Sequence, residues 1–327
     1  MLQIAFVGAF AARLQGLVQD RVGVPCQVIA VDEAAIMSKL ADLDVLVTLV
    51  FNREMAAAGR RLKLVQVPAA GLDRIDPPAL PPGVWLANAY GHEVGIAEYV
   101  IGAILTWNRE LCRADTLLRR GEWDSQWAAS APPPPRPELA GKTLGVLGYG
   151  RIGQALARRA RAFDMAIWAI RRDPTQPVSC APDFLGGPDA RNELLRRADY
   201  LVVTSPLTPE TRGVLGQREV ALMKPSAVLV NVARAEIVDE EALYQALRRG
   251  AIAGAILDVW YRYPTGAGPT LPSRLPFHEL GNVLMTPHVS GWTEGMLEAR
   301  AEVIAENIRR IARGERPLNL VAAGDSQ

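Results

Sequence analysis

The chain alternates short apolar runs with amphipathic stretches along most of its length. Runs rich in valine, isoleucine and leucine predict buried strands, and apolar stripes at helical spacing between them predict helices. This alternation is typical of a parallel sheet that is covered by helices on both faces. In the first part of the chain the predicted strands are 3–7, 27–31, 44–50 and 63–67, and the predicted helices are 11–20, 33–41 and 53–61.

A second series of strands and helices follows a long helical stretch that is predicted over residues 94–120. Ile96, Val100 and Leu105 fall on one face of that stretch. The second series contains predicted strands at 143–147, 166–170, 200–203, 227–231, 253–257 and 283–286, and a predicted helix at 294–313. Two α/β units of unequal size are the simplest description of this pattern.

A proline-rich segment, residues 131–137 (APPPPRP), lies between the long helical stretch and the second series. Proline cannot continue a helix, and consecutive prolines form a stiff, extended segment. The segment is therefore predicted either to link two domains or to cross the surface of one domain.

The length of 327 residues is enough for two domains with sizeable cores. Apolar residues make up 49% and charged residues 22%, which is typical of a globular protein. The 36 basic and 35 acidic residues give a net charge of +1, so no overall charge would attract nucleic acid or an anionic membrane. We expect neither as a partner.

The three cysteines, Cys26, Cys112 and Cys180, are widely spaced and form no CxxC pair. This spacing predicts neither a disulfide framework nor a zinc site, and it fits a reducing compartment. The first residues are apolar but lack a basic region, and no uncharged run approaches ~18 residues. We expect a cytoplasmic protein without a bound metal.

A glycine-rich turn, with Gly148, Gly150 and Gly153 in GYGRIG, stands between a predicted strand and an amphipathic helix. The pattern GxGxxG alone is a weak signal, but this context is the one that dinucleotide binding requires. The first glycine allows a tight turn, the second lets a pyrophosphate approach the backbone, and the third lets helix and strand pack closely. The turn therefore predicts a dinucleotide cofactor.

The residues after the next strand bear on which cofactor is used. An NAD site usually has an acidic residue there, about 20 positions after the loop, which binds the ribose hydroxyls. Here strand 166–170 is followed by Arg171 and Arg172, and Asp173 comes two positions late. A guanidinium can hold the 2′-phosphate of NADP in a bidentate contact. We predict that NADP(H) is preferred over NAD(H); two solvated loop arginines without this role are the alternative.

Seven motifs follow one another in a specific order along nearly the whole chain. They are VPAAGLDRID (67–76), GIAEY (95–99), the GYGRIG loop, SPLTPETRGVL (205–215), VNVARAEIVDEEAL (230–243), AILDVW (255–260) and NVLMTPHVSGWT (282–293). With these motifs the chain resembles the D-isomer-specific 2-hydroxyacid dehydrogenases. That family includes glyoxylate/hydroxypyruvate reductases, D-lactate and phosphoglycerate dehydrogenases, and formate dehydrogenase.

The resemblance implies a reaction and the two residues that perform it. The reaction is NAD(P)H-dependent reduction of small 2-oxo acids, of the glyoxylate or hydroxypyruvate type, to D-2-hydroxy acids. Arg234 would hold the substrate carboxylate and polarise the carbonyl, since arginine stays charged and presents a fork of donors. His288 would be the general acid/base, since imidazole titrates near neutral pH.

The resemblance also implies contacts to the cofactor. Arg151 and Ile152 would meet the pyrophosphate together with the glycine loop. Pro206 and Val232 would line the nicotinamide ribose, and Asp258 would face the nicotinamide ring.

On the substrate side, Ala70 and Gly71 correspond to positions whose backbone amides hold the carboxylate. Two positions depart from the family pattern. Tyr263 stands where a glutamate usually pairs with the catalytic histidine, and a neutral partner favours imidazolium less than a carboxylate does. His92 stands where an asparagine is common, and it is either a substrate residue or an ordinary loop histidine.

For the architecture, the resemblance implies two Rossmann-like or flavodoxin-like α/β domains with parallel sheets and a cleft between them. A discontinuous substrate-binding domain would comprise residues 1–95 and 290–327. The dinucleotide-binding Rossmann domain would comprise residues 96–289 and include the proline-rich segment. Family members are typically homodimers, with the helix after Val94 and the segment 117–127 helping to pair the subunits.

Two other functions stay open at this point. The missing glutamate leaves a formate-dehydrogenase-like enzyme as one alternative. A non-catalytic, dinucleotide-sensing regulator of the same fold is the other, although such regulators keep the glutamate and the acidic ribose ligand.

Overall fold

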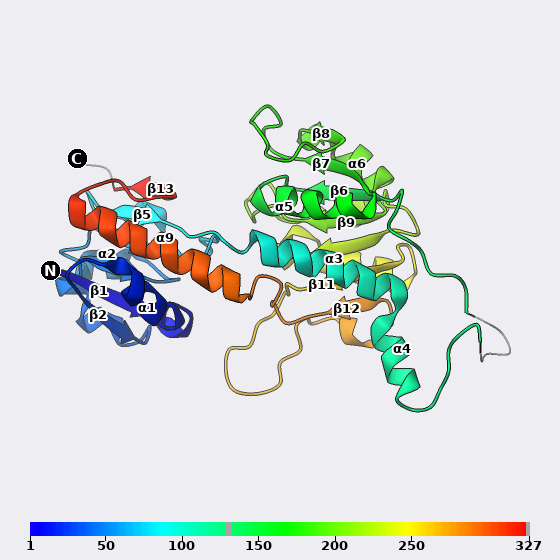
Figure 1. The fold of residues 1–327 in the computed structure, drawn as a ribbon, viewed down its shortest axis with the longest axis horizontal. Coiled ribbons are helices and arrows are strands. Elements are labelled where there is room, and N and C mark those ends of the chain that lie inside the picture. Colours follow the sequence, from blue (N-terminus) through cyan, green and yellow to red (C-terminus); the bar gives the residue numbers. More distant parts are fainter. Residues whose placement is uncertain (128–132, 325–327) are drawn as a thin grey trace. The chain divides into compact units, whose positions relative to one another are not determined.

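The computed structural model describes residues 1–127 and 133–324. The chain forms two compact units, which are coloured by sequence in Figure 1. The first unit is built from Met1–His92 and Thr293–Gln327, and the second from Glu93–Trp292. The first unit is thus assembled from both ends of the chain, whereas the second is continuous.

The first unit is a sheet with helices on both faces. Its elements are β1 (Leu2–Val7), α1 (Gly8–Val22), β2 (Cys26–Val31), β3 (Val45–Val47), α2 (Arg53–Ala58), β4 (Leu64–Gln66), β5 (Trp85–Ala87), α9 (Glu294–Arg313) and β13 (Leu320–Ala323). The strand order is β13-β5-β4-β3-β1-β2, and all pairs are parallel except β13 with β5. Helices α1 and α9 cover one face, and α2 with two short 3₁₀ turns covers the other.

The second unit contains a seven-stranded parallel sheet. Its elements are α3 (Glu93–Arg109), α4 (Leu111–Leu118), β6 (Thr143–Leu147), α5 (Arg151–Ala160), β7 (Ala166–Ile170), β8 (Phe184–Gly186), α6 (Arg191–Arg197), β9 (Tyr200–Val203), α7 (Gln217–Val220), β10 (Val228–Asn231), α8 (Glu240–Arg248), β11 (Gly254–Leu257) and β12 (Val283–Met285). The strand order is β12-β11-β10-β9-β6-β7-β8. Helices α3 and α5 pack on one face, and α6, α7 and α8 lie on the other.

The predicted fold class, two α/β units with parallel sheets, is confirmed, but the helix predicted at 33–41 is wrong. The chain makes two 3₁₀ turns there, Ile36–Ser38 and Leu40–Asp42. Ile36 and Leu40 are the only buried positions of the segment. Two short turns bury both side chains, so no regular helix is needed to cover this part of the sheet.

The long helical stretch is interrupted at Glu110, which has a φ of 49° and separates α3 from α4. The Glu110 carboxylate accepts hydrogen bonds from Arg136 at 2.5 and 2.9 Å and from Arg113 at 3.0 Å. The described part of the proline-rich segment, residues 133–137, belongs to the second unit. Its first two residues, 131 and 132, lie outside the described residues.

Buried amides tie the two ends of the chain together inside the first unit. Asn307 of α9 and Gln66 of β4 are both fully buried. Asn307 Nδ2 donates to Gln66 Oε1 at 2.7 Å, and Asn307 Oδ1 accepts from the Leu318 N–H at 2.6 Å. Gln66 Nε2 donates in turn to the carbonyls of Val67 and Ala87. Because buried polar groups need satisfied hydrogen bonds, these contacts fix α9 in one register on the sheet.

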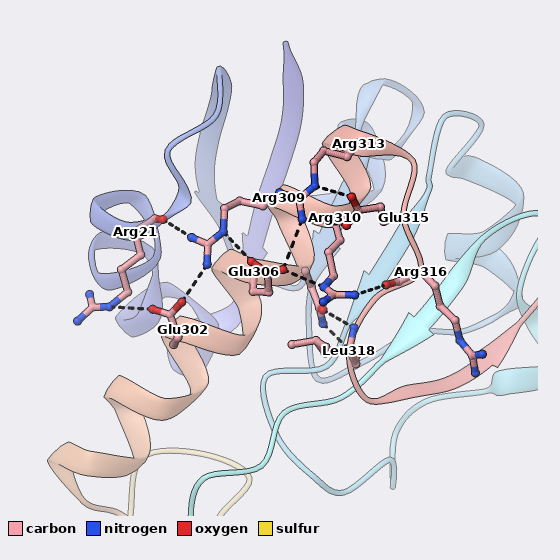
Figure 2. A network of polar contacts seen from close by, with 10 residues as sticks. Arg21, Glu302, Glu306, Arg309, Arg310, Arg313, Glu315, Arg316 and Leu318 are labelled. Atoms are coloured by element: carbon pink, nitrogen blue, oxygen red, sulfur yellow. Dashed lines mark hydrogen bonds and ion pairs between the residues drawn. The ribbon is translucent and has the colours of Figure 1, made fainter.

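Ion pairs surround the exposed side of α9 (Figure 2). Arg309 pairs with Glu302 at 2.9 Å and with Glu306 at 2.8 Å, and Arg21 at the end of α1 lies 3.9 Å from Glu302. Exposed pairs contribute only about 0–1 kcal/mol each. The apolar stripe of α9, which includes Ile304 and Ile308, therefore supplies most of its binding to the sheet.

Candidate active site

The second unit has a topological switch point between β6 and β9. From β6 the chain proceeds outward through β7 and β8, and it then returns to β9 on the other side of β6. In doubly wound sheets, ligands bind at such a point, beside the carboxyl ends of the strands. The glycine loop follows β6 and contacts the end of β9, because Thr204 Oγ1 donates to Gly148 O at 2.7 Å.

The three glycines of the loop occupy different surroundings. Gly148 has a φ of +106°, and a Cβ there would lie 2.5 Å from the Ser205 nitrogen. A Cβ at Gly153 would lie 3.0 Å from the Gly148 carbonyl oxygen, whereas a Cβ at Gly150 would meet nothing within 4 Å. The first and third positions therefore require glycine for turn and packing, and the backbone at Gly150 is open to a ligand.

Helix α5 begins at this open backbone. Its N-cap residue, Gly150, offers no side-chain acceptor, and its first turn has no acidic residue. The amides and the dipole at such a helix end favour an anion, so the arrangement fits the pyrophosphate of a dinucleotide.

The other predicted cofactor residues differ in exposure. Arg151 is exposed and lies 3.8 Å from the Glu93 carboxylate, and Ile152 is half-buried. Pro206, which follows β9, is exposed, and Val232, which follows β10, is buried.

The two arginines after β7 have different surroundings. Arg171 is half-buried, and its Nη2 donates to Gln176 Oε1 at 2.9 Å. Arg172 is exposed. The pKa of Glu210 lies below its usual value because Thr208 hydrogen-bonds the carboxylate, and the nearby charge of Arg172 adds to this effect. The pair thus consists of one ordered and one solvated guanidinium.

His288 and Tyr263 are hydrogen-bond partners, with 2.8 Å between Tyr263 Oη and His288 Nδ1. The Trp260 N–H also donates to the phenol oxygen, at 3.3 Å. His288 has a φ of +58°, a left-handed conformation that is uncommon outside glycine and that recurs at functional sites. Its side chain is exposed, so the imidazole is accessible.

The fully buried carboxylate of Asp258 holds the loop that carries His288. Asp258 Oδ1 accepts hydrogen bonds from Thr286 Oγ1 at 2.6 Å and from the Val289 N–H at 2.8 Å. Oδ2 accepts from the Ser290 N–H at 2.8 Å. A buried carboxylate needs such donors, and here they hold the Thr286 side chain before His288 and the two backbone amides after it. The contact of Asp258 with the nicotinamide ring stays a prediction.

Arg234 follows β10 at the same edge of the sheet. Its Nη1 donates to the Ala233 carbonyl at 2.7 Å, and the buried Asn231 donates to the Arg234 carbonyl at 2.9 Å. Burial raises the pKa of Tyr263, while the Trp260 N–H and the charge of Arg234 act against this rise. The phenol is therefore neutral at physiological pH. Tyr263 connects the three residues of this cluster, because it hydrogen-bonds His288 and lies within the electrostatic influence of Arg234.

The predicted substrate residues belong to the first unit. Ala70 and Gly71 lie in the loop after β4, where Asn88 Nδ2 donates to the Ala70 carbonyl at 2.9 Å. His92 is half-buried and ends the N-terminal segment of that unit. All three residues lie in the first unit, and their contacts with a substrate stay predictions.

Two polar residues that support the histidine loop, Thr286 and Tyr99, were not predicted as site residues from the sequence. Thr286 binds Asp258, its hydroxyl lies 2.6 Å from Tyr99 Oη, and its carbonyl accepts from Trp260 Nε1 at 2.8 Å. The available signal was an aspartate after one strand (LDVW) and a threonine after the next (MTPH). In a parallel sheet these strand ends are adjacent.

Two wider properties of the structure bear on function. Within the ranges 1–127 and 133–324, no helix combines the length and the apolarity needed to cross a membrane. The same part of the chain holds no group of three or more His, Cys, Asp or Glu residues arranged for a metal ion.

The doubly wound sheet with a glycine loop at its switch point defines a dinucleotide-binding domain. Residues 101–290 match the family model described as D-isomer specific 2-hydroxyacid dehydrogenase, NAD binding domain. The chain is 38% identical over 292 residues to D-3-phosphoglycerate dehydrogenase of Methanocaldococcus jannaschii. The matched region covers 88% of this chain and 53% of that protein. It is 36% identical over 294 residues to glyoxylate reductase of Thermococcus gammatolerans, covering 88% and 85%.

A solved structure agrees with these relatives. The D-isomer specific 2-hydroxyacid dehydrogenase from Xanthobacter autotrophicus Py2, in complex with NADPH and MES, has a TM-score of 0.77, 27% identity and 98% coverage of both chains. The chain belongs to the D-isomer specific 2-hydroxyacid dehydrogenase family, a family of NAD(P)-dependent oxidoreductases. The family resemblance in the sequence is thereby confirmed. The chain spans about half the length of the phosphoglycerate dehydrogenase that it matches.

Proposed function

We propose that this enzyme reduces small 2-oxo acids, of the glyoxylate or hydroxypyruvate type, to D-2-hydroxy acids with NADPH as the preferred donor. The cluster of Arg234, Tyr263 and His288 in the dinucleotide-binding unit carries the proposal. It combines a carboxylate-binding group, a proton-exchanging group and a partner that orients the latter. The relative named glyoxylate reductase, at 36% identity, supports this substrate class.

The residues of the cluster have distinct roles in the proposed reaction. The reduced nicotinamide, when bound, supplies the hydride. Arg234 binds the substrate carboxylate and polarises the carbonyl through its fork of donors. His288, as imidazolium, donates its Nε2 proton to the carbonyl oxygen, which becomes the hydroxyl. We propose that the amides of Ala70 and Gly71 also hold the carboxylate and that His92 contacts the substrate.

Tyr263 sets the resting state of His288. The Trp260 N–H donates to the phenol oxygen, which leaves the phenol hydrogen able to donate to Nδ1 of His288 when the imidazole is neutral. A neutral imidazole then carries its own hydrogen on Nε2. In this tautomer Nε2 has no free lone pair, so it cannot accept a proton from the hydroxy acid. A carboxylate would accept from Nδ1–H and leave Nε2 as the base. A neutral imidazole held in this tautomer is a poor base for oxidation of the hydroxy acid, and reduction proceeds at the more acidic pH values where His288 is imidazolium.

Substitution Tyr263→Glu is expected to extend reduction to higher pH and to speed oxidation of the hydroxy acid. A carboxylate beside the ring favours imidazolium, so the alkaline limb of kcat/KM for reduction should move up by about one pH unit. The measurement is the pH profile in both directions. Tyr263→Phe, which removes the hydrogen bond without adding charge, is the matched control and should show no upward shift. An unchanged profile for Tyr263→Glu contradicts the role of Tyr263.

The preference for NADPH rests on Arg171 and Arg172. They place two positive charges after β7, where an NAD site usually has an acidic residue. The structural relative from Xanthobacter autotrophicus, which is in complex with NADPH, supports this assignment. The other proposed cofactor residues are Gly148, Gly150, Arg151, Ile152, Gly153, Pro206, Val232 and Asp258.

We also propose assignments beyond the active site. Residues 1–95 and 290–327 form the substrate-binding domain, and residues 96–289 the dinucleotide-binding domain. A homodimer is proposed because α4 buries no side chain and leaves Leu111 and Leu118 exposed at 52% and 53%. The cysteines are free thiols, which fits the cytoplasm.

Oxidation of NADPH and of NADH, followed with glyoxylate, hydroxypyruvate, pyruvate and longer 2-oxo acids, tests the proposal. Glyoxylate or hydroxypyruvate should be the best substrate, and kcat/KM should be at least about tenfold higher with NADPH, from one charge-assisted contact to the 2′-phosphate. Preference for NADH overturns the cofactor assignment. Formate oxidation without 2-oxo-acid reduction, or dinucleotide binding without turnover, overturns the function.

A further inference from the structure

The loop between β7 and β8 contains a relay of hydrogen bonds that joins an arginine to an aspartate. Asp173 Oδ1 accepts from the Thr175 N–H at 3.0 Å and from its hydroxyl at 2.6 Å. Asp173 Oδ2 accepts from Gln176 Nε2 at 3.0 Å, and Gln176 Oε1 accepts from Arg171 Nη2 at 2.9 Å. The Gln176 amide thus lies between a carboxylate and a guanidinium.

The chemistry of the amide suits this place. Its NH₂ group can only donate and its oxygen can only accept, so the two charged partners fix its orientation. A glutamate at 176 would bring a second carboxylate against Asp173, and an alanine would reach neither partner. Gln176 therefore orders the Arg171 guanidinium and binds the second carboxylate oxygen of Asp173, whose first oxygen is held by Thr175.

The relay changes what Asp173 and Arg171 can do. Asp173 is the acidic residue nearest to the position that binds the ribose hydroxyls in NAD sites. Its oxygens already accept three hydrogen bonds within the loop. Arg171 Nη1 is buried and has no hydrogen-bond partner among the described residues. A buried donor without an acceptor costs free energy, and a bound anion that reaches this guanidinium would supply one.

We propose that Gln176 is a specificity-determining residue for the cofactor, and that it acts as a positioning residue. It holds the Arg171 guanidinium for the 2′-phosphate of NADPH, and it keeps the Asp173 carboxylate away from the ribose hydroxyls that NADH would offer. This inference rests on the proposed preference for NADPH. An ordered guanidinium loses less conformational entropy when the phosphate binds.

The far end of the same loop is anchored independently. Gln154 Oε1 accepts from the Ser179 N–H at 2.6 Å and from the Ser179 hydroxyl at 2.9 Å. Tyr149 Oη donates to the Cys180 carbonyl at 2.7 Å. A variant at Gln154 therefore loosens the loop without touching the relay, and it provides a matched control.

The test compares Gln176→Ala and Gln176→Glu with the unaltered enzyme. Steady-state kinetics give kcat/KM with NADPH and NADH, and calorimetry gives the affinity for 2′,5′-ADP and for 5′-AMP. Gln176→Ala should lower the NADPH/NADH ratio of kcat/KM by about tenfold, through KM rather than kcat. Gln176→Glu should lower it further, since the added carboxylate repels the phosphate. The affinity for 2′,5′-ADP should fall in both variants, while that for 5′-AMP should not.

The outcomes separate this inference from the function on which it rests. If the unaltered enzyme prefers NADH, the proposed cofactor is wrong. If it prefers NADPH and both Gln176 variants keep the ratio, the relay has no role in specificity although the proposed function stands. Gln154→Ala should keep the ratio within about twofold, as expected for a site that shares no partner with the relay. If Gln154→Ala lowers the NADPH/NADH ratio as much as the Gln176 variants do, the effect comes from general loosening of the loop, and the inference is overturned.

Discussion

Replacement of His288 by asparagine is expected to lower kcat/KM for 2-oxo-acid reduction by about 10²–10⁴-fold, the usual contribution of a positioned general acid. Asparagine cannot exchange a proton near neutral pH. It does accept the left-handed backbone conformation of residue 288 more readily than other non-glycine residues, so the loop should keep its shape. The anchoring of that loop through Asp258 uses the amides of Val289 and Ser290 and does not need the imidazole.

The control for this experiment is His278→Asn, which removes an exposed histidine of the same unit. It should keep kcat/KM within about twofold, as surface substitutions away from a site usually do. NADPH binding, measured by fluorescence titration, should persist in His288→Asn because the glycine loop is intact. Near-normal turnover in His288→Asn contradicts the role of His288.

Substitution Arg234→Lys is expected to lower kcat/KM by about 10²–10³-fold, because a lysine keeps the charge but loses the fork that binds a carboxylate and polarises a carbonyl. Part of the loss should appear as a higher KM for the oxo acid, since the carboxylate is held in the ground state as well. The KM for NADPH should change little. Steady-state kinetics with glyoxylate and with hydroxypyruvate measure these constants.

Arg248→Lys is the matched control, since Arg248 is exposed on α8. The same change of residue type should leave all constants within about twofold there. If Arg234→Lys resembles this control, the substrate carboxylate is held by other groups and the proposed role of Arg234 is wrong.

The sequence predicts the helices and strands well where their burial follows a regular pattern along the chain. Strands 143–147, 166–170 and 200–203 and the helix 294–313 were predicted at their observed bounds. Each has either a continuous apolar run or one apolar stripe, which local sequence records directly. The three-residue strands β5 and β8 and the antiparallel β13 were missed, because their pairing depends on neighbours distant in the chain.

Sequence motifs identify the residues of the candidate site, but they do not reveal the hydrogen bonds that hold these residues in place. Motif position singles out His288, Tyr263 and Asp258, yet the spacing of residues along the chain does not show that the Asp258 carboxylate binds the amides after His288. In the same way, the sequence shows Asp173 only as an acid two positions late. Its binding to Thr175 and Gln176 depends on a loop conformation that residue patterns do not specify.

The assembly of the first unit from both chain ends has a consequence for folding order. Asn307 bonds Gln66 across 241 residues, and β13 pairs with β5 only after the last part of the chain is made. Closing so long a loop costs entropy, so such contacts form late. The strands of the second unit all lie within one continuous segment. During synthesis the middle of the chain can therefore fold first, and the strands that leave the ribosome earliest complete their domain last.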